Sequence, residues 1–399
     1  MSLQNTPSSQ RLHIGFFGLR NAGKSSVVNA VTNQQISLVS DVLGTTTDPV
    51  KKAMELLPLG PVVIIDTPGL DDLGELGEMR VKRAKEVLKT TDIAVVVIDA
   101  QKGKTQEDLL LLDTISEMKI PFVVAYNKSD ISNCDIQLKE NEISVSAMTG
   151  ENIEELKNMI AKIGKDSKKE KPLVSDLLST GDIVVLTIPI DESAPKGRLI
   201  LPQQLVIRDI LDHHCMCICT QVEELQKTLS SLFRKPKLVI TDSQAFGRVS
   251  KIVPDDITLT SFSIIMARHK GDLLSLVKGA KALESIKDGD KILIAEGCTH
   301  HRQCNDIGTV KMPNWIENFT NAKPQFSFTS GTGYPETLDD FRLIVHCGGC
   351  MLNEKEMKRR MNEAQKCDIP IVNYGVAIAH MNGILKRSLA PFSDVLELL

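Results

Sequence analysis

The thiols of the segment IVHCGGC, residues 344–350, are side chains whose types and spacing suit metal or redox chemistry. Cys347 and Cys350 are separated by two glycines, which let the backbone turn tightly enough for both sulfurs to face one centre. Two thiols at this spacing can form half of a zinc site, a redox pair or part of an iron-sulfur cluster. The choice among these depends on what the rest of the chain carries.

A glycine-rich segment near the N-terminus, GLRNAGKS at residues 18–25, fits the P-loop pattern of phosphate-binding proteins. It follows an apolar run that predicts a strand, and it precedes a helical pattern. Its backbone amides and the helix N-terminus are expected to cradle phosphate oxygens, with Lys24 at the β- and γ-phosphates and Ser25 on Mg²⁺. The predicted nucleotide-binding residues of this segment are Asn21, Ala22, Gly23, Lys24, Ser25 and Ser26.

Three further motifs follow predicted strands and complete a nucleotide site. DTPG at 66–69 is expected to place Asp66 near the magnesium and the Gly69 amide near a γ-phosphate. NKSD at 127–130 ends in Asp130, whose carboxylate can accept both N–H donors of the Watson–Crick edge of guanine, which adenine does not offer. SAM at 146–148 can offer the Ala147 amide to the guanine carbonyl. The nucleotide is therefore predicted to be GTP, and the rest of the base site is predicted to be Asn127, Lys128 and Ser146.

Apolar, β-branched runs alternate with helical patterns along the chain and must position these motifs, as in VVIIDTP, IAVVVIDA and PFVVAYNK. This alternation predicts an α/β fold, with a mostly parallel sheet in the first domain. No internal repeat is recognisable in the sequence. We expect three α/β domains, with a GTP-binding domain at 1–165, a linker at 166–175, a second domain at 176–270 and a third at 271–399.

Composition narrows the class of protein. No run approaches the roughly 20 apolar residues of a membrane span, so a soluble protein with no membrane partner is expected. The N-terminal MSLQNTPSSQ lacks an export pattern, and nine cysteines without that pattern point to a reducing compartment, which predicts a cytoplasmic location. A net charge of -4 with well-mixed charges argues against nucleic acid as a partner.

The nucleotide motifs, in this order, resemble those of the TrmE/Era branch of the translation-factor-related GTPases. GTTTD at 44–48 is similar to switch I of that branch, which implies that a hydroxyl among Thr45, Thr46 and Thr47 reaches Mg²⁺. The resemblance implies Lys24, Thr46 and Gly69 as catalytic residues and Ser25 and Thr46 as Mg²⁺ ligands.

Two positions in this GTPase-like part bear on the rate of hydrolysis. Asn21 matches the asparagine that helps to bind K⁺ in potassium-activated members, although an ordinary loop asparagine is the alternative interpretation. Leu70 stands where Ras-like enzymes carry a catalytic glutamine. Because leucine cannot orient water, intrinsic hydrolysis is expected to be slow and to be stimulated by K⁺.

The thiols allow several interpretations when they are taken by themselves. A structural zinc site would use Cys298, Cys304, Cys347 and Cys350 as a closed tetrahedral set, and a redox dithiol would use the last two alone. Cys215, Cys217 and Cys219 alternate along a predicted strand, so they are expected to share a face and to act as small buried apolar residues.

The combination of parts is more specific than any one of them. A Cys-x-His followed by His-Cys-x-x-Cys, behind a TrmE-like GTPase domain, resembles the family of iron-iron hydrogenase maturation GTPases, known as HydF. The resemblance implies a 4Fe-4S cluster held by Cys298, Cys347 and Cys350. It further implies a homodimer or higher oligomer, dimerised through the middle domain, that receives a diiron precursor from two radical-SAM maturases and delivers it to apo-hydrogenase.

The fourth cluster ligand stays open. His300 and His346 belong to the motif, and Glu296 lies two residues before Cys298 on an extended chain, so each is a candidate. Water or a small external ligand is a further candidate.

The main alternative function is a TrmE-like tRNA-modification or ribosome-assembly GTPase with a structural zinc site. The TrmE type carries a folate-binding domain ahead of its GTPase domain, whereas only the short segment MSLQNTPSSQ precedes the first predicted strand region here. That difference favours the hydrogenase-maturation interpretation.

Overall fold

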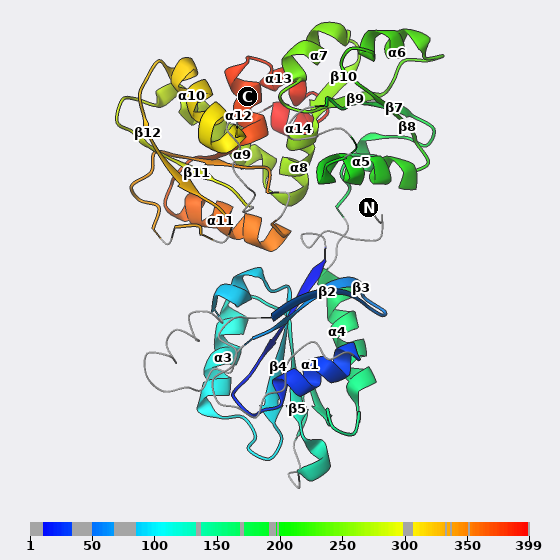
Figure 1. Ribbon diagram of the computed structural model, residues 1–399, viewed down its shortest axis with the longest axis vertical. Coiled ribbons are helices and arrows are strands. Elements are labelled where there is room, and N and C mark those ends of the chain that lie inside the picture. The colour runs from blue at the N-terminus through cyan, green and yellow to red at the C-terminus, as the bar shows by residue number, and fades with distance from the viewer. Residues whose placement is uncertain are drawn as a thin grey trace. The chain divides into compact units, whose positions relative to one another are not determined.

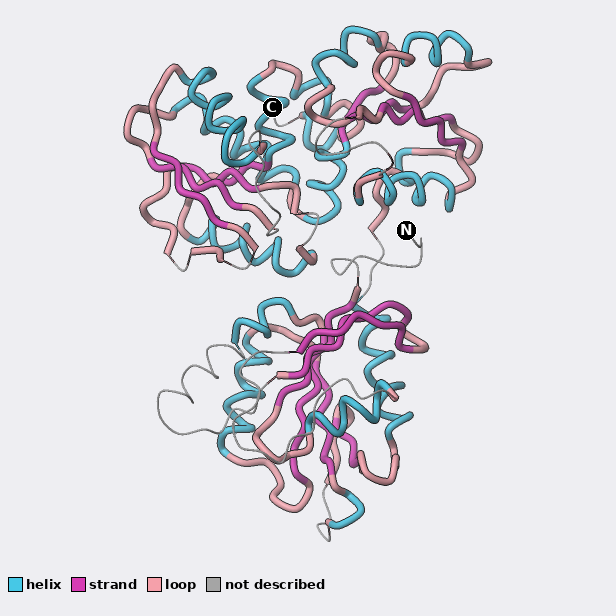
Figure 2. Tube along the Cα trace, viewed as in Figure 1, coloured by secondary structure: helices cyan, strands magenta, loops and turns pink. Residues whose placement is uncertain are grey.

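The computed structural model describes residues 11–33, 50–67, 85–132, 137–167, 171–190, 197, 199–297, 306–331, 333–335, 337–349 and 352–397. The chain divides into two compact units, residues 1–170 and 171–399 (Figure 1). Three sheets flanked by helices confirm the predicted α/β class (Figure 2). Among the described residues, no helix combines the length and the apolar character that crossing a membrane requires.

The first unit is built on a six-stranded sheet in the order β2-β3-β1-β4-β5-β6. Only the β2–β3 pair is antiparallel, so the sheet is mostly parallel, as predicted. Its strands are β1 (Leu12–Phe17), β2 (Val50–Leu56), β3 (Gly60–Asp66), β4 (Ile93–Asp99), β5 (Phe122–Asn127) and β6 (Glu142–Val145).

Helices cover both faces of this first sheet, which explains the near-continuous apolar character of its central strands. Helices α1 (Lys24–Thr32) and α4 (Ile153–Ser167) pack on one face, and α3 (Gln106–Glu117) packs on the other. Every residue of β4, which reads IAVVVID, is buried. The parallel strands thus end at one edge, where the nucleotide motifs lie.

The second unit holds two four-stranded parallel sheets. The first has the order β10-β9-β7-β8 and consists of β7 (Ile183–Thr187), β8 (Met216–Thr220), β9 (Leu238–Thr241) and β10 (Thr258–Ser261). The second has the order β12-β11-β13-β14 and consists of β11 (Lys291–Ala295), β12 (Gln325–Thr329), β13 (Leu343–His346) and β14 (Ile371–Asn373). If the four strands of each sheet are numbered by their order in the chain, their order across both sheets is 2-1-3-4.

This shared arrangement is a structural repeat that was not recognisable in the sequence. The helices of the first half are α5 (Leu201–Asp212), α6 (Leu225–Ser231), α7 (Phe246–Ile252) and α8 (Phe262–Lys270). Those of the second half are α9 (Leu273–Lys281), α10 (Met312–Thr320), α11 (Glu354–Lys366), α12 (Tyr374–Met381), α13 (Leu385–Ser388) and α14 (Ser393–Leu396). In both halves the fourth strand runs directly into a helix capped by its own last residue, Ser261 or Asn373.

The two sheets of the second unit share one continuous hydrophobic core. That core contains Val184 and Phe262 from the first half and Leu276 and Ile294 from the second, all nearly inaccessible to solvent. The expected boundary at residue 271 therefore separates two sheets without separating two cores.

The three alternating cysteines differ in burial. Cys215 lies just before β8 and is 6% exposed, which confirms its expected role as a small buried residue. The same expectation is wrong for Cys219, which is exposed because β8 is an edge strand of its sheet. Cys217 is half-buried.

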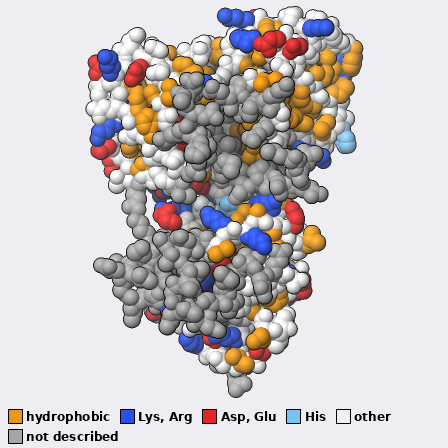
Figure 3. Space-filling view, viewed as in Figure 1, with side chains coloured by type: hydrophobic (Ala, Val, Ile, Leu, Met, Phe, Trp, Pro, Cys, Tyr) orange, Lys and Arg blue, Asp and Glu red, His pale blue; other side chains and the backbone are white. Residues whose placement is uncertain are grey.

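The distribution of charged side chains on the surface agrees with the mixing of acidic and basic residues along the sequence (Figure 3). On the face of the molecule seen in Figure 3, acidic and basic side chains of described residues lie interspersed rather than gathered by sign.

Candidate functional site

The P-loop lies between β1 and α1, as the sequence predicts. Gly23 precedes the helix with φ of 81°, a left-handed conformation that glycine adopts without strain. A Cβ atom at this position would lie 2.2 Å from Nδ2 of Asn127, so no other residue fits without displacing that side chain. Asn21 also has positive φ, at 61°, and is exposed.

Lys24, Ser25 and Asp66 come together at the ends of α1 and β3. The Ser25 hydroxyl donates to Oδ2 of Asp66 at 2.7 Å, and Nζ of Lys24 is 4.0 Å from Oδ1 of the same carboxylate. Lys24 and Asp66 are each 8% exposed, and Oδ1 of Asp66 accepts no hydrogen bond from any residue that the structure describes. A buried carboxylate oxygen beside a hydroxyl is a donor set that suits Mg²⁺.

The predicted base site is assembled around Asn127, which is 3% exposed at the end of β5. Its amide donates to the Ala22 carbonyl at 3.0 Å, and its carbonyl oxygen accepts from the Ala147 N–H at 3.0 Å. Asn127 therefore ties the P-loop to the segment that begins at Ser146, a positioning role beyond the predicted nucleotide contact. Ser146 is fully buried, and its hydroxyl accepts from the Thr149 N–H at 3.1 Å.

Lys128 and Asp130 complete this region. Nζ of Lys128 bonds to Oδ2 of Asp99 at 2.6 Å, a partner that the sequence motifs did not single out. Burial raises the pKa of the Asp99 carboxyl, but Lys128 and the Gln101 N–H outweigh burial and hold that pKa below its usual value. Asp130 lies exposed in a short 3₁₀ turn, Ser129–Ile131, where its carboxylate is open to a ligand.

Several predicted GTPase residues lie outside the described part of the chain. They are Thr45, Thr46, Thr47, Gly69 and Leu70. Their contacts with Mg²⁺, the γ-phosphate and water stay predictions.

A second edge, in the second unit, holds the described part of the thiol motif. β11 and β13 are parallel neighbours in which Ala295 lies opposite His346, and the Cys347 N–H donates to the Ala295 carbonyl at 2.9 Å. Glu296 and Cys347 therefore leave the two strands at the same edge, as predicted from their positions after adjacent strands.

The Cys347 sulfur has an environment that suits a thiolate ligand. It accepts N–H groups from Gly297 at 3.0 Å and from Gly349 at 3.4 Å. Such N–H···S contacts are among the features that tune cysteine-bound clusters. The turn needs its glycine, because Gly349 has φ of 61°. Cys347 is the thiol of the motif that the structure describes, and Cys298, His300, Cys304 and Cys350 lie outside the described residues. Among the described residues, no group of three or more His, Cys, Asp or Glu side chains could hold a metal ion.

His346 is fully buried, and both of its ring nitrogens are engaged. Nδ1 lies 2.7 Å from the Cys347 carbonyl oxygen, and Nε2 lies 3.1 Å from Nη1 of Arg360. Burial, aided by the Arg360 charge, lowers the pKa of His346 to about 4, so the ring is neutral, with Nδ1–H donating and Nε2 accepting. No ring nitrogen is free for iron, and the geometry does not support the prediction of His346 as a fourth ligand.

Glu296 is the other described candidate for that position. It is 5% exposed, and the Tyr374 hydroxyl donates to its Oε1 at 3.3 Å. Burial raises the pKa of the Tyr374 phenol, and the negative charges of Glu296 and Cys347 raise it further. This buried carboxylate therefore lies in the same neighbourhood as the thiolate.

The sequence motifs did not point to Arg360, Lys270 or Tyr374. Arg360 follows Met357 and precedes Met361 and Ala364 on the buried face of α11, and it is only 1% exposed. An arginine at a core position of an amphipathic helix was the available signal, because arginine is seldom fully buried without a partner.

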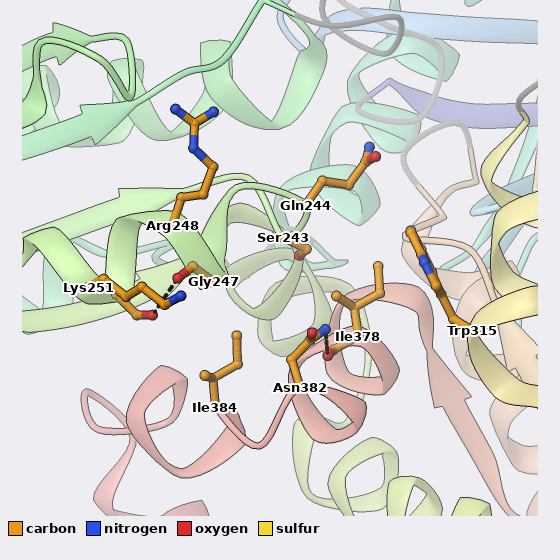
Figure 4. A pocket seen from close by; sticks show the side chains of 10 residues that line it. Ser243, Gln244, Gly247, Arg248, Lys251, Trp315, Ile378, Asn382 and Ile384 are labelled. Carbon is orange, nitrogen blue, oxygen red and sulfur yellow. Dashed lines mark hydrogen bonds between the residues drawn. The ribbon is translucent and has the colours of Figure 1, made fainter. Parts of the chain in front are cut away.

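A pocket of about 520 Å³ lies elsewhere in the second unit, between α7, α10 and the α12–α13 region (Figure 4). Its lining contains none of the predicted nucleotide or cluster residues. The lining residues are Ser243, Gln244, Gly247, Arg248, Ser250, Lys251, Trp315, Ile378, Asn382 and Ile384.

Comparison with known families agrees with the geometry of the first unit. Residues 13–128 match the family model described as 50S ribosome-binding GTPase. With its P-loop between β1 and α1, this unit contains a P-loop GTPase domain.

The second unit matches two models of one further family. Residues 173–271 match the hydrogen maturase F dimerization domain, and residues 274–391 match the hydrogen maturase F tetramerization domain. Together these two matches cover more than half of the chain, and the chain belongs to the hydrogen maturase F family. The descriptions of both domains support assembly into a homodimer or higher homo-oligomer.

Curated relatives match the first unit. The tRNA modification GTPase MnmE of Legionella pneumophila is 36% identical over 148 residues, which are 37% of this chain and 33% of that protein. MnmE of Aquifex aeolicus is 33% identical over 153 residues, which are 37% of this chain and 34% of that protein. The chain thus spans about one third of the length of these relatives.

Solved structures also resemble parts of the chain. The crystal structure of a probable GTP-binding protein engB is 26% identical, covers 39% of this chain and 99% of its own, and has a TM-score of 0.31. The structure of Aquifex aeolicus Era bound to GDP and aluminium fluoride is 19% identical, covers 52% of this chain and 91% of its own, and has a TM-score of 0.35.

Proposed function

We propose that this protein is a GTPase and an iron-sulfur scaffold that carries the diiron precursor of the hydrogenase active site to apo-hydrogenase. The observation that carries the proposal is Cys347, which stands at the shared edge of β11 and β13 with two backbone N–H groups on its sulfur. Membership of the hydrogen maturase F family supports the same role. Radical-SAM maturases that supply the precursor are the partners that this role requires.

The cluster site in this proposal consists of Cys298, Cys347 and Cys350. A 4Fe-4S cluster bound by three thiolates supplies one iron with an exchangeable coordination position. The N–H groups of Gly297 and Gly349 would stabilise the charge on Cys347. The candidates for that exchangeable position are Glu296, His300 and a water or small external ligand, and the burial of Glu296 after β11 supports the first.

The nucleotide site in this proposal follows from the first unit. Lys24 contacts the β- and γ-phosphates, Ser25 and Asp66 hold Mg²⁺, and Asp130 selects guanine. Thr46 and Gly69 complete the site at the γ-phosphate. Asn127 keeps the phosphate and base halves in register through its two hydrogen bonds.

A TrmE-like tRNA-modification or ribosome-assembly GTPase with structural zinc is the second candidate function. The match of residues 13–128 and the MnmE relatives favour it. Those findings concern the first unit, whereas residues 173–391 match hydrogen maturase F models. The scaffold proposal accounts for both parts of the chain.

Anaerobic reconstitution of the full chain with iron and sulfide tests the scaffold proposal. We expect a brown protein with about four iron atoms per chain and an electron paramagnetic resonance signal after reduction. The matched arm supplies zinc instead of iron. A colourless protein that takes up one zinc ion per chain tightly and retains no iron would contradict the proposal and favour the second candidate.

Potassium is expected to stimulate GTP hydrolysis severalfold over sodium at equal ionic strength, since Leu70 cannot orient water and Asn21 can help to bind K⁺. The test measures phosphate release in KCl and NaCl for the wild type and for Asn21→Gly. Glycine tolerates the positive φ at this position, so Asn21→Gly removes the side chain without adding strain. Equal rates in both salts for the wild type would refute the role of K⁺.

A further inference from the structure

Lys270 is the last residue of α8, which follows the first sheet of the second unit. It contacts residues of the thiol segment, the name used here for residues 346–352, which begins at the last residue of β13 in the second sheet. It is 5% exposed, and its Nζ donates to the carbonyl oxygens of Gly349 at 3.1 Å and Leu352 at 2.9 Å. These two carbonyls flank Cys350 in the sequence. Burying an ammonium group is costly, so its presence here indicates a specific use.

The contact between Lys270 and the Gly349 carbonyl fixes the orientation of the Gly349 peptide groups. The Gly349 N–H points to the Cys347 sulfur at 3.4 Å, while the Gly349 carbonyl accepts from Lys270. The Leu352 N–H also donates to the Gly349 carbonyl, at 3.0 Å. Lys270 thereby holds the turn in the orientation that directs an N–H group at the thiolate.

Arg360 holds the other end of the same segment. Its Nη1 contacts Nε2 of His346 at 3.1 Å, and the opposite ring nitrogen of His346 donates to the Cys347 carbonyl at 2.7 Å. Its Nη2 donates to the Gly331 carbonyl at 2.6 Å, and its Nε donates to Glu356 at 2.8 Å. A series of two hydrogen bonds thus runs from Arg360 through the His346 ring to the backbone carbonyl of Cys347.

Charged side chains near the thiol segment are Lys270 and a group of ion pairs around Glu356. Glu356 contacts both Arg359 and Arg360, and these two cations outweigh burial and lower the pKa of the Glu356 carboxyl. Arg359 also pairs with Glu363, so these two arginines face two carboxylates and the group is balanced in charge. The positive charge that bears on Cys347 is therefore that of Lys270, a buried cation whose Nζ donates to the Gly349 and Leu352 carbonyls.

We propose that Lys270 and Arg360 are positioning residues that hold the backbone at Cys347, Gly349 and Leu352, and that Lys270 supplies positive charge against an anionic thiolate-bound cluster. This inference rests on the proposed scaffold function. Lys270 belongs to the stretch that matches the dimerization domain, so it also joins that part of the unit to the thiol segment. Residues beyond the ligands that orient a metal site commonly change metal affinity by about 10- to 100-fold when they are replaced.

The test compares the reconstituted full chain with Lys270→Met, Lys270→Arg and the control Lys278→Met, which alters an exposed lysine of α9. For Lys270→Met we expect iron transfer to a chelator to become about 10- to 100-fold faster and the midpoint potential to become more negative. The potential shifts because reduction adds negative charge that the missing cation no longer offsets. Lys270→Arg, which keeps the charge, is expected to retain most of the wild-type potential.

Arg360→Lys separates positioning from charge and decides the matter if Lys270→Met does not fold. It keeps a cation but loses the fork that reaches both His346 and Gly331, so faster iron loss with a smaller change in potential is expected. The inference would be overturned if Lys270→Met and Arg360→Lys both lost iron at the wild-type rate and kept the wild-type potential. If Lys270→Met does not fold, iron loss at the wild-type rate in Arg360→Lys would overturn it. A wild type that takes up no iron would instead contradict the scaffold function itself.

Discussion

Replacing Cys347 with alanine is expected to reduce the iron content of the reconstituted protein from about four atoms per chain to almost none. The sulfur is the described acceptor of two backbone N–H groups at the β11–β13 edge, and a cluster left with two thiolates is poorly retained. Cys298→Ala and Cys350→Ala are expected to have the same effect. Iron analysis and visible absorption after anaerobic reconstitution measure the loss.

Two cysteine replacements serve as matched controls for that experiment. Cys304→Ala and Cys367→Ala each remove a thiol and should leave the cluster intact, and Cys367 is an exposed residue at the end of α11. GTP hydrolysis should survive every cysteine change, because the P-loop lies in the other compact unit. Retention of a full cluster by Cys298→Ala, or its loss in Cys304→Ala, would overturn the ligand assignment.

Lys24→Ala is expected to lower the rate of GTP hydrolysis by at least about 100-fold, to near the background rate. Lys24 is buried 4.0 Å from Asp66 at the start of α1, where its ammonium is placed to meet the β- and γ-phosphates. Phosphate release under saturating GTP measures the effect. The wild type should hydrolyse ATP hardly at all, because Asp130 has no pair of donors to accept from adenine.

Lys102→Ala is the control for this prediction, since Lys102 is an exposed lysine of the same unit. It should hydrolyse GTP at the wild-type rate. Turnover by Lys24→Ala close to that of Lys102→Ala would refute the assigned role. Equal GTP and ATP rates in the wild type would refute the assignment of guanine to Asp130.

The first unit was largely predictable because its motifs are local. The P-loop, DTPG, NKSD and SAM motifs each follow a predicted strand, so their placement needs only the alternation of strands and helices. The tie from Asn127 to Ala22 and Ala147 was not predictable, because it joins segments far apart in the sequence. The role of Asp99 was not predictable for the same reason, because Asp99 ends β4 whereas its partner Lys128 follows β5.

The second unit shows where sequence reasoning fails. His346 was considered as a metal ligand because its position in the motif suits iron, but its burial against Arg360 engages both ring nitrogens. That contact depends on how α11 packs, which the pattern of α11 alone does not specify. Lys270 is still harder to predict, because nothing in the sequence joins the end of α8 to Gly349 and Leu352.

The continuous core of the second unit bears on how this protein can be divided. Phe262 and Leu276 belong to one core although they lie on opposite sides of residue 271, so cutting there would leave an apolar surface bare on both fragments. A fragment of residues 271–399 would also lack Lys270, and its thiol segment would lose that support. The smallest autonomous body that carries the thiol segment therefore begins near residue 171, where the first compact unit ends.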